Sequence, residues 1–177
     1  MYRKFFLALV YAVLSSSAAS AELLVGGKPA ELGLEGESGG LLDGSAWSSA
    51  SLIGRVHLLM YVDRDESKLN ARVEEMLAAQ KYDPSQVGSV GVVNMAATWK
   101  PSFAIDMILK SKQEKFPNTI YVRDKAKVFV KQWGLTDDSY HVVALGREGQ
   151  VLFSAGGKLS DSQITTLIEV IDGEIGR

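Results

Sequence analysis

The stretch "LLMYVDRDESKLNARVEEML" (residues 58–77) changes its hydrophobic pattern halfway along. Its first part belongs to the continuous apolar run "RVHLLMYV" (55–62), which is typical of a central strand covered on both faces. From about residue 67 to residue 81, apolar residues recur instead at helical spacing, as Leu69, Val73, Met76 and Leu77. The stretch therefore predicts a buried strand and a following helix, joined by a charged junction at residues 63–66.

The chain beyond this helix continues to alternate strands and helices. We predict strands at 89–95 and 119–122, a helix at 101–116 that begins at Pro101, and a shorter helix that ends at Gly134. The stripe of the longer helix is expected to comprise Ile105, Ile108 and Leu109.

The last third of the sequence predicts a hairpin and a terminal helix. Two apolar runs surround "GREGQ" (146–150), which is a hairpin signal. Ser160 and Gln163 have the spacing of a capping box, and they precede a helical stripe of Ile164, Leu167, Ile168 and Ile171.

The segment before the central strand is rich in glycine. "LLVGGKPAELGLEGESGGLLDGSAW" (23–47) has short apolar pieces separated by turn residues, so we expect a small hairpin with a loose loop at 35–40. A phosphate-binding loop is not favoured, because "VGGKPAELG" lacks the Gly-Lys-Ser/Thr ending and no helix follows at once.

The first 21 residues have the pattern of a cleaved secretory signal peptide. Arg3 and Lys4 precede an apolar run of 10 residues (5–14), and Ala19 and Ala21 are the small residues that signal peptidase accepts. That run is too short for a permanent membrane anchor, which needs roughly 20 residues. We predict a secreted mature chain that begins at Glu22, periplasmic in a Gram-negative bacterium.

The mature chain has the composition of one globular domain. Removing residues 1–21 from the 177-residue chain leaves 156 residues (22–177), enough for one domain with a substantial core. Losing Arg3 and Lys4 leaves 17 basic residues against 21 acidic ones, a net charge of −4. Phosphate binding requires a basic face, so nucleic acid is not an expected partner. No later apolar stretch is long enough to span a membrane.

Cysteine is absent, and histidine occurs only at His57 and His141. The missing cysteines exclude thiol nucleophiles, thiolate metal ligands and disulfides. Both histidines lie inside apolar, strand-like runs, where a structural histidine is the favoured interpretation. We therefore expect no cofactor and no metal centre built from clustered His or Cys.

The predicted order of elements resembles the thioredoxin-like fold in its larger, redoxin-type form. This is an α/β sandwich, a central mixed β-sheet flanked by helices, here with an N-terminal β-hairpin. The lead-in "SASLIGRVHLLMYVD" and the hairpin "VVALGREGQVLF" agree with that fold. More narrowly, the signal peptide, the cysteine-free "GRVHLLMYVDRDESKLNARVEEM", the "VVNM" strand and the "WGL" before the hairpin resemble the YtfJ family of periplasmic proteins.

The resemblance implies that the junction replaces a redox site. Redox-active members of the fold carry Cys-x-x-Cys between the first core strand and its helix, where this chain has "VDRDES" (62–67). They also carry a cis-proline before the hairpin, at a place that falls within "TDDSYHVV" (136–143), which has no proline. Thiol–disulfide oxidoreductase activity is therefore not expected. The junction carboxylates would instead cap the following helix, each contributing roughly 0.3 to 1 kcal/mol.

The same junction supplies the candidate site residues. Carboxylates from the junction and from the loop facing it would gather near one edge of the sheet, with Arg64 as a local counterion. Three interpretations stay open, namely solvated helix caps, a weak cation or partner site, and acid–base catalysis. The candidate binding residues are Asp63, Arg64, Asp65, Glu66, Asp137, Asp138 and Tyr140.

The sequence favours an exported, non-catalytic binding protein that uses the former active-site face. Its expected partner is a protein or a peptide. The alternative is an enzyme that depends on carboxylates or a metal, or a degenerate relative of peroxidases or thiol oxidoreductases.

Overall fold

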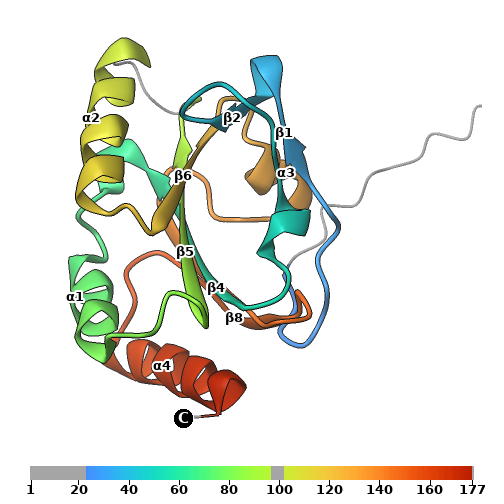
Figure 1. Ribbon diagram of the computed structural model, residues 1–177, viewed down its shortest axis with the longest axis vertical. Helices are drawn as coiled ribbons and strands as arrows, with labels where there is room; N and C mark the ends of the chain where they lie inside the picture. The colour runs from blue at the N-terminus through green and yellow to red at the C-terminus, as the bar shows by residue number, and fades with distance from the viewer. Residues whose placement is uncertain (1–22, 97–101, 177) are drawn as a thin grey trace, which may run out of the picture.

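The strand predicted at 55–62 is β4 (Val56–Asp63), and it lies inside a six-stranded mixed sheet (Figure 1). The computed structural model describes residues 23–96 and 102–176, so the predicted signal peptide (1–21) and Pro101 lie outside the described residues. The strand order is β2-β6-β5-β4-β7-β8. The other strands of this sheet are β2 (Gly39–Leu41), β5 (Val87–Asn94), β6 (Thr119–Asp124), β7 (Tyr140–Leu145) and β8 (Val151–Gly156).

The direction of the strands brings three strand ends together. β4 runs parallel to β5, and β5 runs parallel to β6. β7 and β8 follow as the predicted hairpin, and β7 pairs antiparallel with the other side of β4. The carboxyl ends of β4, β5 and β6 consequently lie side by side at one edge of the sheet, the position where open α/β sheets place their ligands.

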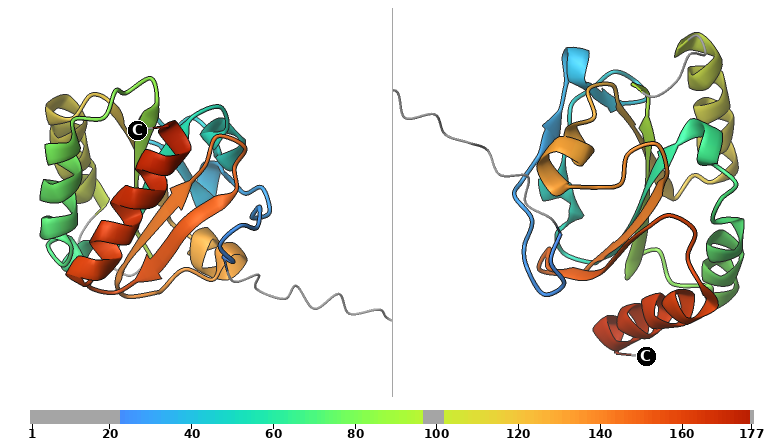
Figure 2. Two further views of the ribbon diagram at one scale, coloured as in Figure 1. Left: turned by 90° about the horizontal axis from the view of Figure 1, so that it is seen from below. Right: turned by 180° about the vertical axis from the view of Figure 1, so that it is seen from behind.

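Helices cover both faces of the sheet. One face carries α1 (Ala71–Gln80), α2 (Ser102–Lys115) and α4 (Asp161–Ile175), and the other carries α3 (Val128–Trp133) and the N-terminal segment (Figures 1 and 2). Figure 2 shows α4 crossing the sheet beside α1. No helix in the described ranges is long and apolar enough to cross a membrane.

Each face has its own apolar core because side chains alternate along β4. Leu59 and Tyr61 point toward α3, where the ring of Phe129 packs against Tyr61, Trp47 and Trp133 with centroid separations of 5.6, 5.7 and 5.2 Å. The opposite face buries residues of β4 and β7 against α1 and α4, among them Val56, Leu58, Val73, Val142, Ile164, Leu167 and Ile171.

The terminal helix has the predicted cap. The Gln163 backbone N–H donates to Ser160 Oγ at 3.3 Å, and the Ser160 backbone N–H donates to Gln163 Oε1 at 2.9 Å. These reciprocal bonds satisfy groups that a helix start leaves without partners. The capping box confirms the helix start that the sequence predicted.

The helix after the junction begins later than predicted. Residues 64–66 form a short 3-10 helix, η3 (Arg64–Glu66), and α1 begins only at Ala71. Asn70 holds this boundary. Its side-chain amide forms hydrogen bonds with the loop after β8 and none that caps α1. The prediction that Asp65 and Glu66 cap the first turn of α1 was therefore wrong.

The glycine-rich segment is more ordered than predicted. β1 (Gly33–Leu34) and β3 (Trp47–Ser48) form the expected antiparallel pair, followed by the 3-10 turn η2 (Ser49–Leu52). The stretch expected as a loose loop instead forms η1 (Gly36–Ser38) and β2, which pairs with β6. A Cβ on Gly39 would lie 1.8 Å from the Arg123 carbonyl oxygen, so only glycine permits this approach.

Candidate functional site

Three buried polar residues end the three parallel strands. Asp63 of β4 is the register partner of Asn94 of β5, which is the partner of Asp124 of β6. Their exposed fractions are 5%, 0% and 0%. Buried polar groups are costly unless they are hydrogen-bonded, so the partners of each side chain indicate what it does.

The Asp124 carboxylate holds the start of α3. Oδ1 accepts from the backbone N–H of Ala126 at 3.1 Å and of Val128 at 2.9 Å, and Oδ2 accepts from Phe129 N–H at 3.1 Å. The Tyr61 hydroxyl lies 3.5 Å from Oδ2, and burial raises the pKa of that phenol. Asp124 thus supplies the N-terminal cap that Lys127, in the left-handed region at φ 54°, does not provide.

Asp63 has an equivalent structural role at the junction. Its Oδ1 accepts from Asp65 N–H at 3.2 Å as the cap of η3, and its own backbone N–H donates to the Ser139 carbonyl at 2.7 Å. Burial is the main cause that raises the pKa of this carboxyl, and the nearby charges of Asp138 and Asp65 add to it. The residue ties the junction to the facing loop.

The facing loop is held by an ion pair that the sequence did not reveal. Lys127 Nζ donates to Asp137 Oδ2 at 2.7 Å and lies 4.0 Å from Asp138 Oδ1, while Asn94 Nδ2 donates to Asp137 Oδ1 at 3.1 Å. The bond from Lys127 lowers the pKa of Asp137. Asn94 and Asp124 could have been predicted, because each ends a strand at this edge. No comparable signal marks Lys127.

The sheet divides the predicted site residues into two groups. Asp63, Asp137 and Asp138 lie on the α3 side around Lys127, whereas Arg64 and Tyr140 line a groove on the opposite side. Of the other two junction carboxylates, the one at 65 is exposed and the one at 66 is half-buried. In the part of the chain that the structure describes, no group of three or more His, Cys, Asp or Glu side chains could hold a metal ion.

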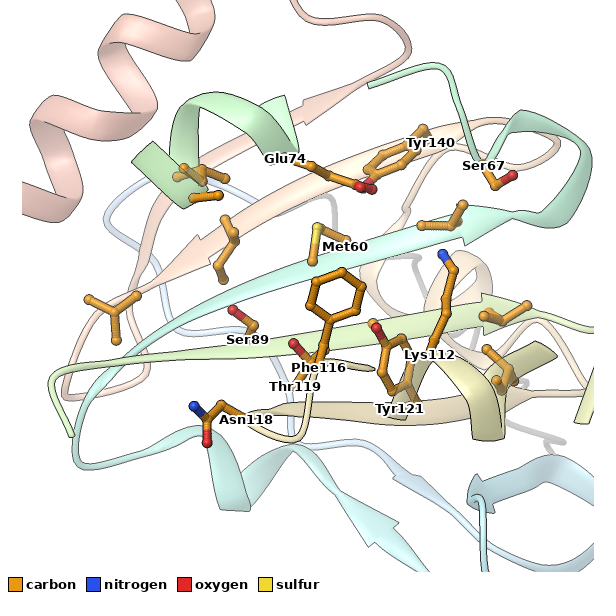
Figure 3. Close-up of a pocket in the computed structure, with 18 of the residues that line it drawn as sticks. Met60, Ser67, Glu74, Ser89, Lys112, Phe116, Asn118, Thr119, Tyr121 and Tyr140 are labelled. Carbon is orange, nitrogen blue, oxygen red and sulfur yellow. The ribbon is translucent and has the colours of Figure 1, made fainter. Parts of the chain in front are cut away.

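The groove lies between α1 and α2, over the faces of β4, β5 and β6, and has a volume of about 560 Å³ (Figure 3). The small residues Ser89 and Gly91 form part of its floor. Ile108 and Phe116 form part of its α2 wall, and their exposed fractions are 45% and 46%. Ile108 was expected in the buried stripe of this helix, but only Ile105 and Leu109 are buried there.

The groove contains a polar pair from two elements. The Tyr140 hydroxyl of β7 donates to Glu74 Oε1 of α1 at 3.2 Å, and Figure 3 shows the two side chains pointing toward one another. Burial raises the pKa of Tyr140, so the phenol stays protonated and donates this bond. Sequence reasoning placed Tyr140 with the junction carboxylates; period-two alternation along β7 puts it with Val142 on the opposite face.

The family described as "Bacterial protein of unknown function (YtfJ_HI0045)" matches residues 30–174, which include every strand of the main sheet. The chain belongs to this family. A relative from Haemophilus influenzae, described as an uncharacterized protein, is 29% identical over 131 residues, covering 72% of this chain and 71% of the relative. The Escherichia coli protein YtfJ, also described as uncharacterized, is 24% identical over 128 residues, covering 71% of this chain and 70% of its own.

Solved structures confirm the thioredoxin-like fold of this YtfJ-family chain. A provisionally assigned thiol:disulfide interchange protein, DsbE, from Chlorobium tepidum has a TM-score of 0.63 at 18% identity, covering 88% of this chain and all (100%) of its own. A thiol-disulfide isomerase from Corynebacterium glutamicum has a TM-score of 0.58 at 14% identity, with coverages of 81% and 96%. The YtfJ-family chain has that fold without any cysteine.

Proposed function

We propose that this YtfJ-family protein is an exported, non-catalytic binding protein whose ligand site opens beside the junction. The observation that carries the proposal is the groove between α1 and α2. Its volume of about 560 Å³ lies within the range of roughly 300–1,000 Å³ that is usual for small-molecule sites. Arg64 and Ser67 line it, so the groove reaches the place where redox-active relatives of the fold carry their thiols.

The hydrogen bonds of the junction support a binding role over a catalytic one. Asp63 caps η3, Asp124 caps α3, and Asp137 is paired with a lysine. Each of these carboxylates accepts a hydrogen bond that holds a loop or a helix start in place, whereas general acid and base groups must reach a substrate. These bonds favour the binding role over the alternative of a carboxylate- or metal-dependent enzyme.

Export is the second component of the proposal. Residues 1–21 have the charge, apolar run and small-residue ending of a signal peptide. A cysteine-free domain also suits an oxidising compartment, because it can form no wrong disulfide there. We place the mature protein in the periplasm of a Gram-negative source.

The partner predicted from the sequence, a protein or peptide, would meet the exposed rim of the junction. Asp138 has a side chain that is 76% exposed, and Asp65 is exposed as well. A partner with a basic segment would be steered by these charges, chiefly through its association rate. This contact would lie beside the groove and leaves the groove itself open.

Native mass spectrometry of protein recovered from the exporting cell tests the proposal. We expect a bound small molecule that leaves on denaturation. Ser89→Trp should abolish it by filling the floor of the groove, whereas Ser111→Trp, the same exchange at an exposed α2 position outside the groove, should retain it. A wild-type protein that carries no added mass would contradict the proposed binding function, as would equal loading of both variants.

A further inference from the structure

We infer that the groove binds an anionic amphiphile, a molecule with one aliphatic chain and a negatively charged head. The chain lies on the apolar floor between α1 and α2, and the head is held at Arg64. This inference rests on the proposed function, because it names the ligand class for the same groove.

The apolar part of the ligand follows from the side chains of the groove. Aliphatic residues contribute the floor from β4 and β5 and both helical walls, and Figure 3 shows Met60 and Phe116 among the side chains that line the groove. The aliphatic lining includes Leu58, Met60, Leu77, Val93, Ile105 and Ile108. Such a surface gains free energy when an aliphatic chain displaces water from it.

The shape of the site favours a small molecule over a protein. Stable protein interfaces bury roughly 800 Å² on each partner over a broad patch. This site is instead a hollow of about 560 Å³ enclosed by two helices and the sheet. A single extended chain fits a hollow of this volume.

The charge of the ligand follows from the basic residues of the lining. Arg64, Lys81 and Lys112 line the groove, and Glu74 is the one acidic residue among the lining side chains described. The Tyr140 hydroxyl already donates to Glu74. The chain as a whole has 21 acidic and 19 basic residues, so the basic excess in the groove is local and opposite in sign to the protein. An anionic head is complementary to it.

Arg64 has an unused donor at the groove. Its Nη1 nitrogen is buried and has no hydrogen-bond partner among the described residues. A buried donor without a partner is costly, and a guanidinium presents its donors in a planar fork that matches a carboxylate or phosphate. An anionic head at this end would satisfy the donor, which is why we place the head at Arg64 rather than at the exposed lysines.

Dodecanoate and dodecyltrimethylammonium have chains of equal length and heads of opposite charge. Comparing their affinities, with both below their micellar concentrations, tests the charge of the head separately from the chain. By titration calorimetry on the full mature protein, we expect dodecanoate to bind at least about tenfold more tightly than the cation of equal chain length. Shortening the carboxylate should weaken binding by up to about fourfold for each methylene removed, the factor expected for burying a CH₂ group.

Two sets of variants test whether the head of the ligand binds at Arg64. Arg64→Gln should weaken dodecanoate binding by about tenfold without weakening binding of the cation, whereas Arg147→Gln, which removes an equal charge at the exposed β7–β8 turn, should change neither. Ile108→Glu and Ile108→Lys remove the same side chain from the groove wall. The glutamate variant should bind dodecanoate less tightly than the lysine variant, and the order should reverse for the cation.

The outcomes separate this inference from the proposed function. Equal binding of the two amphiphiles, with no effect of Arg64→Gln, would overturn the anionic head while leaving the groove as a binding site. Dodecanoate binding that survives in Ser89→Trp would overturn the placement in the groove. A native protein that carries a ligand while neither amphiphile binds would overturn the ligand class alone. A peptide or a cationic molecule released from the native protein would overturn it in the same way.

Discussion

The Nδ1 nitrogen of His141 accepts a hydrogen bond from the backbone N–H of Thr136 at 3.0 Å. Nδ1 is therefore unprotonated, the ring proton is on Nε2, and Nε2–H donates to Ser154 Oγ at 2.9 Å. Burial lowers the pKa of His141 to about 4. The histidine is a neutral structural residue that joins the facing loop to the hairpin, as its place in an apolar run predicted.

This histidine predicts a loss of stability on mild acidification. The unfolded chain binds a proton at His141 below a pKa of about 6.5, whereas the folded chain does so only below about 4. The free energy of unfolding should consequently fall as the pH drops from about 6.5 to about 4, by on the order of 3 kcal/mol in total. Urea unfolding across this range measures it. His141→Gln should have a lower free energy of unfolding at neutral pH and should lose less of it on acidification. If the free energy of unfolding of His141→Gln falls with pH as steeply as that of the wild type, other groups cause the loss.

Asp63 predicts a pH effect of opposite sign. Burial raises the pKa of its carboxyl above that of the unfolded chain, so the folded state binds this proton more tightly. Its contribution to stability is therefore full at low pH and is lost as the pH rises from about 3.9 through the raised pKa. At neutral pH, Asp63→Asn should stabilise the protein, since the amide oxygen can still accept from Asp65 N–H without a buried charge. Denaturant melts at pH 7 check this, and destabilisation there would mean that the charge itself is required.

Asp65 and Glu66 should matter little to stability. Both precede α1 in a three-residue 3-10 helix, so replacing both with Lys should change the free energy of unfolding by no more than about 0.5 kcal/mol. The paired replacement of Glu114 and Glu169, which are exposed elsewhere, by Lys is the matched control. A loss near 2 kcal/mol from the junction change alone would restore the capping role that the sequence suggested.

Asn70 should contribute much more to the free energy of unfolding. It is 2% exposed, its Nδ2 donates to the Gly157 carbonyl at 2.9 Å, and its Oδ1 accepts from Leu159 N–H at 2.9 Å. Asn70→Ala leaves both loop groups without partners, so we expect a loss of about 2 to 4 kcal/mol. The exposed Asn118 provides the control, and its change to Ala should cost less than about 0.5 kcal/mol. Denaturant melts measure both variants. If Asn70→Ala and Asn118→Ala lower the free energy of unfolding by the same small amount, Asn70 does not hold the loop after β8 in place.

The secreted form should begin at Glu22. Ala19 and Ala21 fit the small-residue positions before signal-peptide cleavage. Intact mass spectrometry of protein isolated from the exporting cell measures the N-terminus directly. A chain that keeps residues 1–14 would contradict both the cleavage and the proposed compartment.

Local pattern was sufficient to predict most of the fold. The apolar run of β4, the stripe on α4 and the capping box at Ser160 all depend on neighbours within a few residues, so the sequence displays them directly. The start of α1 was missed because Asn70 is held by contacts 87 and 89 residues away. No periodic pattern encodes such a contact.

The candidate site was predictable only in part. The strand end at Asp63 and the facing loop at Asp137 were found from the order of elements, yet the pairing of Asp137 with Lys127 involves a left-handed backbone at Lys127 that the sequence does not mark. The groove was missed because its walls come from two separate helices, and Ile108 is 45% exposed on one of them. Tyr140 could have been assigned to the groove from strand alternation alone.

The short strand β2 has a consequence for self-association. An uncovered strand edge offers unpaired N–H and C=O groups to a second chain, and aggregation commonly begins at such an edge. β2 occupies the outer edge of β6 with only three residues, and Gly39 makes the close approach possible at a φ angle of 133°. A side chain at Gly39 would push β2 away and expose the edge of β6 at residues 122–124. Gly39 therefore protects the chain against edge-to-edge pairing of β6 with a second copy.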